Sequence, residues 1–457
     1  MMHIVSNRLP ISVKDGMVIP SNGGLVRLWN SHHSTINSPS PGKWFGIDTC
    51  TNHFDNPNLN HQYHLEPLII SELDYHEFYN EFSNSTLWLL FHGLTSLLKI
   101  PTRKSWRAYQ SVNNLMANLV DSKTLPNDYV IINDYHFLYL PKLLKQRRPD
   151  LKVIFYLHTP FPTSELFYKL PQAKILLSSM LFADVIGVQT EIVKNNIIAC
   201  TNQLSTRCEM QEIDNRVKKI HSIPVSIDKR YFNEQSQLLK FKRNSEKNPN
   251  TFTFLGIDRL DPIKGLKEKI EGYRVFLESN PMVHGSVQLK QFIIPSREDC
   301  EIYKSYKSQL FNMIDSVNAT FSNPYWQPID AYYYQMDEDF IIQSYLSSHA
   351  LMITSLADGM NLVAYEYLAS QLEENPGVLC LSNQAGAAQY LHSALQFDPN
   401  CILEIQQCFQ KAMCLSLEER QSRLQQAILY IDRYNVSHWR QSLINTCQLE
   451  SLESSLI

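Results

Sequence analysis

Short apolar runs alternate with helical stretches along most of this chain, and this alternation constrains its fold more than any other feature. The runs have the length of buried strands, and the segments between them have helical spacing. They lie at 3–6, 129–132, 153–157, 185–188, 220–227, 251–255, 291–294, 349–354 and 377–381. Strands interleaved with helices are typical of parallel sheets covered on both faces. We therefore expect an α/β protein with doubly wound parallel sheets.

A polar stretch from Asp228 to Asn250 separates two of these runs and marks the best domain boundary. It carries charges and a helix-breaking proline, Pro249. The chain has 457 residues, which is too long for one typical core. We predict one α/β domain over 1–235 and a second over 236–457, with an interdomain cleft as the ligand site. The tail from Ile402 is helical, and its last helix is a candidate to pack back on the first domain.

The composition excludes several classes of protein. The formal net charge is -4, so no basic footprint for nucleic acid is present. No apolar run approaches the roughly 18 residues of a membrane span, and the N-terminus lacks the pattern of a signal peptide. Nine cysteines occur without a C-x-x-C pair, which fits free thiols in a reducing compartment better than a zinc site. We expect a cytoplasmic protein without a metal, and leave a homo-oligomer open.

The segment 357–366 follows the apolar run at 349–354 and leads into a helix for which Asn361 is a plausible N-cap. Asp358 places a carboxylate at the carboxyl end of the strand, where ligands bind in open α/β sheets. Gly359 lets a ligand approach the backbone closely. Helix N-termini favour anions such as a diphosphate. An ordinary capped connection would explain an isolated Asp-Gly, but the groups described next favour a sugar-nucleotide site.

Two cations, Arg259 and Lys264, follow the strand predicted at 251–255. At this place they can neutralise a diphosphate leaving group without a metal. The alternative is that they form surface ion pairs with the neighbouring Asp258 and Asp261. Because Asp358 has a like position after its own strand, we favour the phosphate role.

Two arginines also follow strand ends, Arg8 in the first half and Arg297 in the second. Guanidinium groups are suited to bidentate phosphate binding. Gly23 and Gly24 would let backbone amides approach a phosphate, although a plain turn is the more common role of an isolated Gly-Gly pair.

Asp134 and His158 each end a strongly apolar strand. A polar residue at such a place is a hydrogen-bonded support or a substrate ligand, and His158 can hold a sugar hydroxyl or transfer a proton. Trp44, Tyr79 and Trp88 lie in loop-like or amphipathic stretches, where both a core role and a substrate-wall role stay open. The chain has no G-x-G-x-x-G, P-loop, G-x-S-x-G or H-E-x-x-H motif, which argues against dinucleotide oxidoreductases, NTPases, α/β-hydrolases and zincins.

With these residues laid out in order, the chain resembles the trehalose-6-phosphate synthase family of retaining glycosyltransferases. The match runs from about His3 to near Trp439 and involves both halves. Its motifs are Val5–Arg8, Gly23–Leu25, Trp44–Gly46, Phe78–Asn84, Leu87–Trp88, Asp134–His136, His158–Pro162, Arg259–Asp261, Lys264–Gly265, Ser296–Arg297, Asp358–Val363 and Glu366–Tyr367.

The resemblance implies a fold and a reaction. The family has two facing Rossmann-like domains, the GT-B fold, with acceptor groups in the first and nucleotide-sugar groups in the second. It transfers glucose from UDP-glucose to glucose-6-phosphate, giving α,α-trehalose-6-phosphate and UDP with retention and without a cofactor or required metal. In such front-face chemistry the leaving phosphate takes the acceptor's proton, unlike the paired carboxylates of retaining glycosidases. Catalysis would then rest on positioning and charge stabilisation.

The same resemblance implies roles for individual residues. The catalytic groups would be Arg259, Lys264, Asp358, His158 and Asp134. The acceptor sugar phosphate would be held by Arg8, Trp44, Tyr79, Trp88, Asp134 and Arg297. The nucleotide sugar would be held by Gly23, Gly24, His158, Arg259, Lys264, Met336, Asp358, Gly359, Met360, Asn361, Leu362 and Glu366, with Glu366 on the ribose hydroxyls.

The chain departs from the family pattern beside the donor site. The positions concerned are Asn133, Pro262, Ile263, Glu298, Met336, Ala357 and Tyr365. One alternative is therefore a related transferase that uses ADP- or GDP-glucose, or glycerol-3-phosphate as acceptor. A second is a non-catalytic sugar-phosphate sensor on the same fold. Retention of Arg259, Lys264 and Asp358 favours an active enzyme over the sensor.

Overall fold

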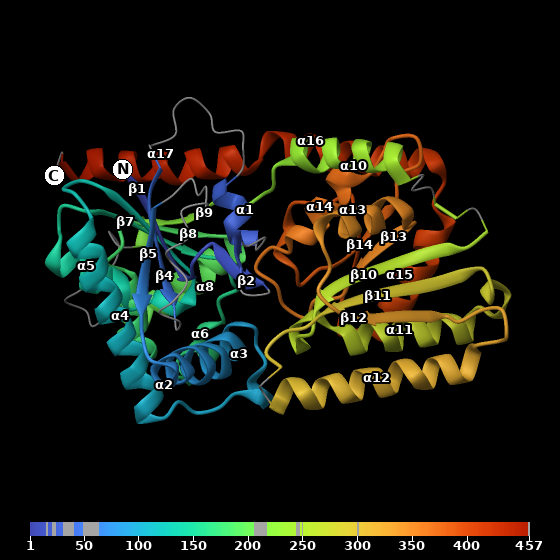
Figure 1. Ribbon diagram of the computed structural model, residues 1–457, viewed down its shortest axis with the longest axis horizontal. Coiled ribbons are helices and arrows are strands. Elements are labelled where there is room, and N and C mark those ends of the chain that lie inside the picture. Colours follow the sequence, from blue (N-terminus) through green and yellow to red (C-terminus); the bar gives the residue numbers. More distant parts are fainter. Residues whose placement is uncertain are drawn as a thin grey trace. The chain divides into compact units, whose positions relative to one another are not determined.

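The computed structural model describes residues 1–14, 17–20, 24–30, 41–48, 64–204, 217–243, 247–248, 250–298 and 301–455 (Figure 1). The chain forms two compact units. The first comprises Met1–Val225 together with Val436–Ile457, and the second comprises Ser226–Asn435. None of the described helices has the length and apolar character needed to cross a membrane.

The first unit is built on a seven-stranded sheet in the order β5-β4-β1-β6-β7-β8-β9, and all its strand pairs are parallel. Its central strands are buried on both faces, which explains their continuous apolar sequences. The strands are β1 (Met2–Arg8), β4 (Pro41–Asp48), β5 (His64–Ile69), β6 (Tyr129–Asn133), β7 (Lys152–Leu157), β8 (Val185–Val188) and β9 (Ile220–Ser222). An antiparallel hairpin joins β2 (Ile11–Lys14) and β3 (Met17–Pro20).

Helices connect these strands. They are α1 (Gly24–Asn30), α2 (Glu72–Tyr75), the π-helix η1 (His76–Trp88), α3 (Leu89–Phe91), η2 (Thr95–Leu97), α4 (Arg103–Lys123), η3 (Tyr135–Phe137), α5 (Leu140–Arg147), α6 (Ser164–Phe167), α7 (Ala173–Met180), α8 (Glu191–Asn202) and the C-terminal α17 (Val436–Ser455). The helix α17 is held in the first unit by Trp439, which is fully buried. The Trp439 ring lies 5.1 Å from the ring of Trp29 and 5.2 Å from that of Tyr156.

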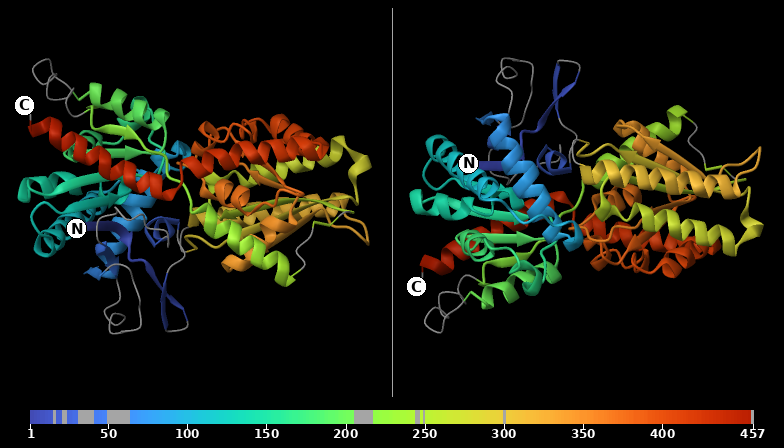
Figure 2. Two further views of the ribbon diagram at one scale, coloured as in Figure 1. Left: turned by 90° about the horizontal axis from the view of Figure 1, so that it is seen from above. Right: turned by 90° about the horizontal axis from the view of Figure 1, so that it is seen from below.

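The second unit is built on a six-stranded parallel sheet in the order β12-β11-β10-β13-β14-β15. Figure 1 shows α11 and α12 on one face of this sheet and α10, α13 and α14 on the other, and Figure 2 gives two further views. The strands are β10 (Phe252–Arg259), β11 (Val287–Ile294), β12 (Ile329–Tyr333), β13 (Ala350–Ile353), β14 (Val378–Ser382) and β15 (Leu395–Phe397). The expected α/β fold with two doubly wound parallel sheets is confirmed.

The helices of the second unit are α10 (Lys229–Arg243), η4 (Pro262–Lys264), α11 (Leu266–Ser279), η5 (Pro281–Val283), α12 (Glu301–Phe321), α13 (Glu338–Ser347), α14 (Leu362–Ser370), η6 (Gly386–Gln389), α15 (Ile402–Cys414) and α16 (Leu417–Arg433). Phe254, Tyr273, Phe276 and Phe409 pack together in its core. These rings join β10, α11 and α15.

The division between the units falls earlier in the chain than the predicted boundary at 235/236. The polar stretch that suggested this boundary contains α10, an amphipathic helix of the second unit. Phe232 and Leu239 are buried, and the Tyr231 hydroxyl donates to Glu338 of α13 at 2.9 Å. Polar sequence here marks the solvated side of a helix rather than a linker.

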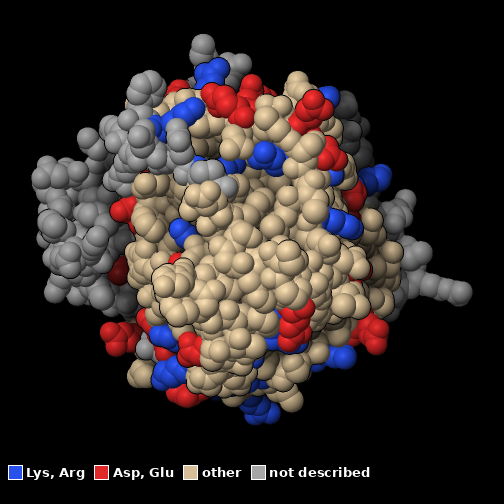
Figure 3. Space-filling model, turned by 90° about the vertical axis from the view of Figure 1, so that its right-hand side faces the viewer, with Lys and Arg blue, Asp and Glu red and all other residues tan. Residues whose placement is uncertain are grey.

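Charged side chains are well mixed on the face shown in Figure 3. Lys, Arg, Asp and Glu surround a broad uncharged area, and no patch of a single sign stands out among the described residues of this face. This distribution fits the near-neutral formal charge.

Candidate functional site

Lys264 and Asp358 meet at the carboxyl ends of two neighbouring strands of the second unit. Lys264 lies in η4, after β10, and Asp358 lies in the loop after β13. Lys264 Nζ is 2.6 Å from Asp358 Oδ2, and both side chains are largely shielded from solvent. The site therefore holds a preformed ion pair at the edge where α/β sheets bind ligands.

Tight backbone packing holds the Lys264 loop against the end of β13. Gly265 has φ 60°, and a Cβ at this position would lie 2.0 Å from the carbonyl oxygen of Thr354. The Thr354 hydroxyl donates to the Lys264 carbonyl at 3.1 Å and to that of Gly265 at 2.9 Å. A glycine is therefore needed next to the lysine, for both its conformation and its size.

The Asp358 carboxylate is oriented by its own loop as well as by Lys264. Asn361 donates to Asp358 Oδ2 at 3.0 Å, and Ser355 does so at 3.4 Å. Asn361 is the N-cap residue of α14, as predicted, but it has φ 74° and its side chain does not cap the helix amides. The N-cap position is therefore confirmed, and the Asn361 side chain binds Asp358 instead of the helix amides.

The two aspartates considered as surface partners of these cations pair with other residues. Asp258 is buried and pairs with Lys269 of α11 at 2.7 Å. Asp261 is fully buried, and its Oδ2 forms an ion pair with Arg297 Nη1 at 3.0 Å. Lys264 consequently pairs across the sheet edge with Asp358. Arg259 ends β10 and is exposed.

Arg297 is also held by its own unit. Besides Asp261, it contacts the hydroxyl of Tyr303, and its guanidinium carbon lies 5.3 Å from the Tyr303 ring centroid. Its φ is 51°, a strained conformation for an arginine. These contacts connect Arg297 to the Lys264 loop through the carboxylate of Asp261.

Most of the remaining residues predicted to bind the nucleotide sugar lie on or near α13 and α14. Glu366 follows Leu362 by one helical turn, and its Oε2 accepts from the Tyr345 hydroxyl at 3.2 Å. Met336 is buried in the loop before α13. Gly359 and Met360 are part of the loop before α14. Gly24 begins α1 in the first unit, while Gly23 lies outside the described residues.

In the first unit Asp134 and His158 meet in the loops that follow the adjacent strands β6 and β7. The amide of His158 donates to Asp134 Oδ1 at 3.2 Å, and the amide of Asp134 donates to the Tyr156 carbonyl at 2.8 Å. Asp134 has φ 73°, which is strained for a non-glycine residue. Burial raises the pKa of Asp134 to about 7, despite three backbone hydrogen bonds that favour its charged form.

The imidazole of His158 lies between two side-chain amides. Nε2 is 3.0 Å from Asn133 Oδ1, and Nδ1 is 3.5 Å from Gln189 Nε2. Burial lowers the pKa of His158 to about 3, so the ring is neutral at ordinary pH. Gln189 was not among the predicted site residues, although its place directly after β8 is the strand-end signal that points to such residues.

Arg8 and a stack of rings form a second group in the first unit. Arg8 Nη2 is 3.4 Å from the Tyr79 hydroxyl, and Tyr79 stacks against Tyr75 at 5.0 Å and His136 at 5.7 Å. Nearby Tyr75 and Tyr79 hydroxyls raise the pKa of Arg8, mainly through Tyr79. The group keeps a guanidinium charge beside aromatic faces.

The two tryptophans differ in their surroundings. Trp88 ends the π-helix η1, and its ring lies 4.0 Å from that of His92. Trp44 is fully buried in β4, and its indole donates to the Ser6 hydroxyl at 2.8 Å. The predicted role of Trp44 as a cleft-lining residue is therefore corrected: it belongs to the core, because a strand flanked on both sides places its large side chains inside.

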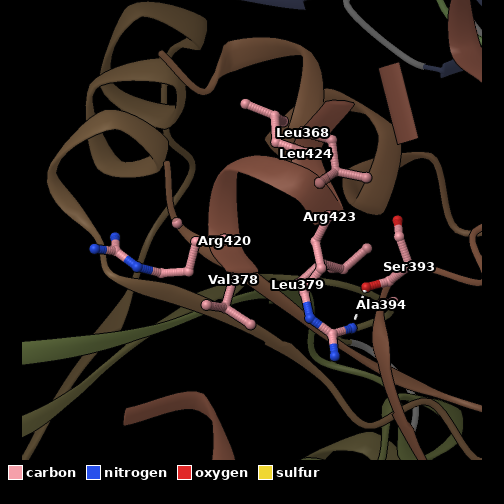
Figure 4. A pocket seen from close by; sticks show the side chains of 9 residues that line it. Leu368, Val378, Leu379, Ser393, Ala394, Arg420, Arg423 and Leu424 are labelled. Carbon is pink, nitrogen blue, oxygen red and sulfur yellow. Dashed lines mark hydrogen bonds between the residues drawn. The ribbon is translucent and has the colours of Figure 1, made fainter. Parts of the chain in front are cut away.

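The cavity in Figure 4 lies at the amino end of β14, the opposite end of the sheet from Lys264. It has a volume of about 10 Å³, and Arg423 Nη1 donates to the Ser393 carbonyl at 2.7 Å beside it. This is room for about one water molecule, so the cavity is too small for a sugar nucleotide. Among the described residues, no cluster of His, Cys, Asp and Glu side chains could hold a metal ion.

Two parallel-sheet units, each with polar groups at the carboxyl ends of its strands, define the class of the protein, which is the GT-B class of glycosyltransferases. The model of glycosyltransferase family 20 matches residues 2–449, and the chain belongs to this family. The resemblance inferred from the motifs is confirmed.

Relatives of known name are similar over nearly all of this chain. It is 33% identical over 456 residues to alpha,alpha-trehalose-phosphate synthase (UDP-forming) A of Dictyostelium discoideum, covering 95% of this chain and 61% of that protein. It is 32% identical to alpha,alpha-trehalose-phosphate synthase (UDP-forming) 1 of Aspergillus fumigatus, covering 99% of this chain and 91% of that protein. The chain therefore spans less than two thirds of the Dictyostelium relative.

Solved structures agree in fold. One is described as trehalose-6-phosphate from E. coli bound with UDP-2-fluoro glucose, with TM-score 0.84, 29% identity and 98% of each chain covered. Another is an alpha,alpha-trehalose-phosphate synthase (UDP-forming) from Burkholderia xenovorans in complex with glucose-6-phosphate. It has TM-score 0.85 and 26% identity, and the match covers 98% of this chain and 99% of that one.

Proposed function

We propose that this protein transfers glucose from UDP-glucose to glucose-6-phosphate and releases UDP and α,α-trehalose-6-phosphate. The observation that carries the proposal is the Lys264–Asp358 pair beside the start of α14. It is supported by the names of the relatives and by the ligands of the two structural neighbours, UDP-2-fluoro glucose and glucose-6-phosphate.

The second unit supplies the groups for the donor. In α14 the side chain of Asn361 does not cap the first amides, so these amides suit a diphosphate. Lys264 and Arg259 add positive charge that offsets the charge of the leaving UDP. Asp358, oriented by Lys264 and Asn361, suits the hydroxyls of the glucose, and Glu366 suits the ribose diol.

The acceptor would be held by Arg8, Tyr79, Trp88, Asp134 and Arg297. The Arg8–Tyr79 contact places a cation beside an aromatic face, an arrangement suited to a sugar phosphate. Arg297 Nη1 lies 3.0 Å from the buried carboxylate of Asp261, so a bound phosphate would share the guanidinium with this carboxylate.

The reaction would proceed on the front face with retention. The acceptor's anomeric oxygen forms the new bond to C1 of the glucose while the bond from C1 to the diphosphate breaks. The acceptor proton passes to the departing phosphate oxygen. No side chain needs to act as nucleophile or base, which fits a neutral His158 and an Asp358 carboxylate bound by Lys264 and Asn361. The side-chain cations Lys264 and Arg259 would supply the charge stabilisation, without a metal.

The test is product analysis with UDP-glucose and glucose-6-phosphate. We expect UDP and a phosphorylated disaccharide whose two anomeric centres are both α, identified by mass and by NMR couplings. Faster nucleotide release from ADP- or GDP-glucose, or with glycerol-3-phosphate as acceptor, would assign a related transferase instead. Binding of both substrates in calorimetry without any nucleotide release would indicate a sugar-phosphate sensor.

A further inference from the structure

The hydrogen bonds around His158 determine which ring nitrogen carries the proton. Asn133 Nδ2 donates to the carbonyls of Val5 at 3.1 Å and Ile131 at 3.3 Å. This fixes the orientation of the Asn133 amide, so its oxygen faces His158 Nε2 at 3.0 Å. Because an amide oxygen can only accept, Nε2 must be protonated.

The contact of Gln189 on the other side of the ring also indicates that the proton is on Nε2. Its Oε1 accepts from the backbone amide of Val225 at 3.0 Å, and a backbone amide can only donate. The Gln189 amide nitrogen therefore faces His158 Nδ1, at 3.5 Å. Since this nitrogen can only donate, Nδ1 must be unprotonated. The hydrogen bond is long, so it is the weaker of the two.

The environment of the ring favours the same neutral form. The Tyr156 ring, on β7, lies 4.6 Å away, and that of Trp439, on α17, lies 6.4 Å away. Among the described residues, Tyr156 and Asp134 are titratable groups beside His158, and the Asp134 carboxylate accepts from the backbone amide of His158 rather than from its ring. Asn133, from β6, and Gln189, after β8, contribute no charge.

We propose that Asn133 and Gln189 are positioning residues that lock His158 as the neutral Nε2–H tautomer, so that Nδ1 offers only an acceptor to a substrate hydroxyl. This inference rests on the proposed function for its link to turnover. His158 then accepts a hydrogen bond from a substrate and transfers no proton. A sugar hydroxyl would compete with the long Gln189 hydrogen bond, whereas the shorter Asn133 hydrogen bond would stay in place and keep the ring oriented.

The lock is tested directly by nitrogen NMR of the full chain with labelled histidine from pH 5 to pH 9. The His158→Gln spectrum identifies the His158 signals among those of the 15 histidines. We expect one protonated nitrogen, Nε2, and one unprotonated nitrogen, Nδ1, throughout this range. Proton attachment at Nδ1, or conversion to the imidazolium within the range, would overturn the proposal. Neither outcome depends on the protein's activity.

The link to turnover is tested with Asn133→Asp. The carboxylate still accepts from Nε2 but adds a charge that favours the imidazolium, so the pKa of His158 rises by about 1–3 units. We expect NMR to report this higher pKa, and the variant's kcat/KM for UDP-glucose to decrease as the pH falls below it, in a range where the wild-type profile stays flat. A pH profile parallel to the wild type, although NMR shows a cationic ring, would contradict the positioning role.

The matched control is Asn113→Asp. Asn113 is also buried in the first unit, and its Nδ2 also donates to two backbone carbonyls, those of Tyr109 at 2.9 Å and His136 at 3.2 Å. Its Oδ1 has no hydrogen-bond partner. This substitution also places a carboxylate oxygen beside two backbone carbonyls but leaves the contacts of His158 intact, so its pH profile should stay parallel to the wild type. If the wild type releases no UDP at any pH, the proposed function fails, and the NMR result still decides the lock.

Discussion

At the scale of single residues, the candidate site depends on which charges are paired and which are neutral. Lys264 has an oriented carboxylate partner, while His158 and Asp134 are pushed by burial toward their neutral forms. Groups held in fixed hydrogen bonds and ion pairs before a substrate binds suit catalysis by preorganised electrostatics.

Replacing Lys264 should affect the chemical step. We expect Lys264→Ala to lower kcat by roughly 10²-fold or more, because a charge that stabilises the leaving diphosphate is lost. UDP release in steady state is the measurement. Lys267→Ala is the control, since Lys267 contacts Gln309 and the Tyr306 ring instead of the site. Equal activity of the two variants would exclude the assigned role of Lys264.

The raised pKa of Asp134 predicts an unusual dependence of stability on pH. A carboxyl whose folded pKa is about 7, above its unfolded value, binds more protons in the folded state between these two values. Its contribution to the free energy of unfolding therefore decreases as the pH rises from about 4 to 7, and is constant above.

Asp134→Asn should remove this part of the pH dependence. We expect the urea midpoint of the variant to fall less than that of the wild type between pH 5 and pH 8. Asp150→Asn is the control, because hydrogen bonding to Arg148 lowers the pKa of Asp150 and its titration lies below this range. Identical pH slopes for wild type and Asp134→Asn would show that Asp134 does not titrate as proposed.

At the scale of elements, two parallel strands and the loops after them create the site. The strands β10 and β13 are neighbours in the sheet, so the loops that follow them must approach each other. Gly265 and Asn361 have positive φ in these two loops, which turns the chain back sharply over the strand ends. The polar groups are thereby fixed by main-chain geometry as well as by hydrogen bonds.

Gly265→Ala should test this main-chain constraint. The added Cβ would meet the Thr354 carbonyl, so we expect a loss of stability of several kcal/mol together with a loss of turnover, compared with about 1–2 kcal/mol for a left-handed alanine alone. Gly285→Ala is the matched control, because Gly285 has φ 86° with nothing within 4 Å of the new Cβ. Urea denaturation and UDP release measure the two effects. Equal stability losses would mean that the Thr354 contact is not limiting.

At the scale of the whole molecule, the chain leaves the first unit after Val225 and returns to it at Val436. The returning helix α17 carries Trp439 and Arg440, and Arg440 Nε donates to the carbonyl of Leu28 at 2.7 Å. The first unit is thus completed by the last part of the chain. Its stability depends on residues that lie more than two hundred positions from the rest of the unit in sequence.

Trp439→Ala should loosen the first unit selectively. Removing a buried tryptophan costs about 3–5 kcal/mol. We expect faster amide hydrogen exchange in β7 and β8, against which α17 packs, and little change in β13 and β14. Leu449→Ala is the control on the same helix, because Leu449 is exposed. Faster exchange that is equal in both sheets would contradict the assignment of α17 to the first unit.

The sequence alone was sufficient for the fold class and for many of the candidate residues. Buried parallel strands are read from apolar runs, and the polar residue that ends such a run lies at the sheet edge where ligands bind. Asp358, Lys264, Asp134 and His158 were all identified in this way. The strand-end rule did not apply to Trp44, whose role the sequence left open because an aromatic side chain is compatible with both a binding surface and a core.

The sequence by itself therefore determined local features, which are the strands, their carboxyl ends and the polar residues placed there. These features can be predicted because hydrophobic periodicity depends only on neighbouring residues. Only the tertiary structure decided the partners. Asp258 forms an ion pair with Lys269, and Lys264 forms one with Asp358. Asn133 and Gln189 lie on opposite sides of the His158 ring. The physical reason is that hydrogen bonds and ion pairs require approach within about 3 Å. Residues far apart in sequence reach this distance only after the sheets have assembled.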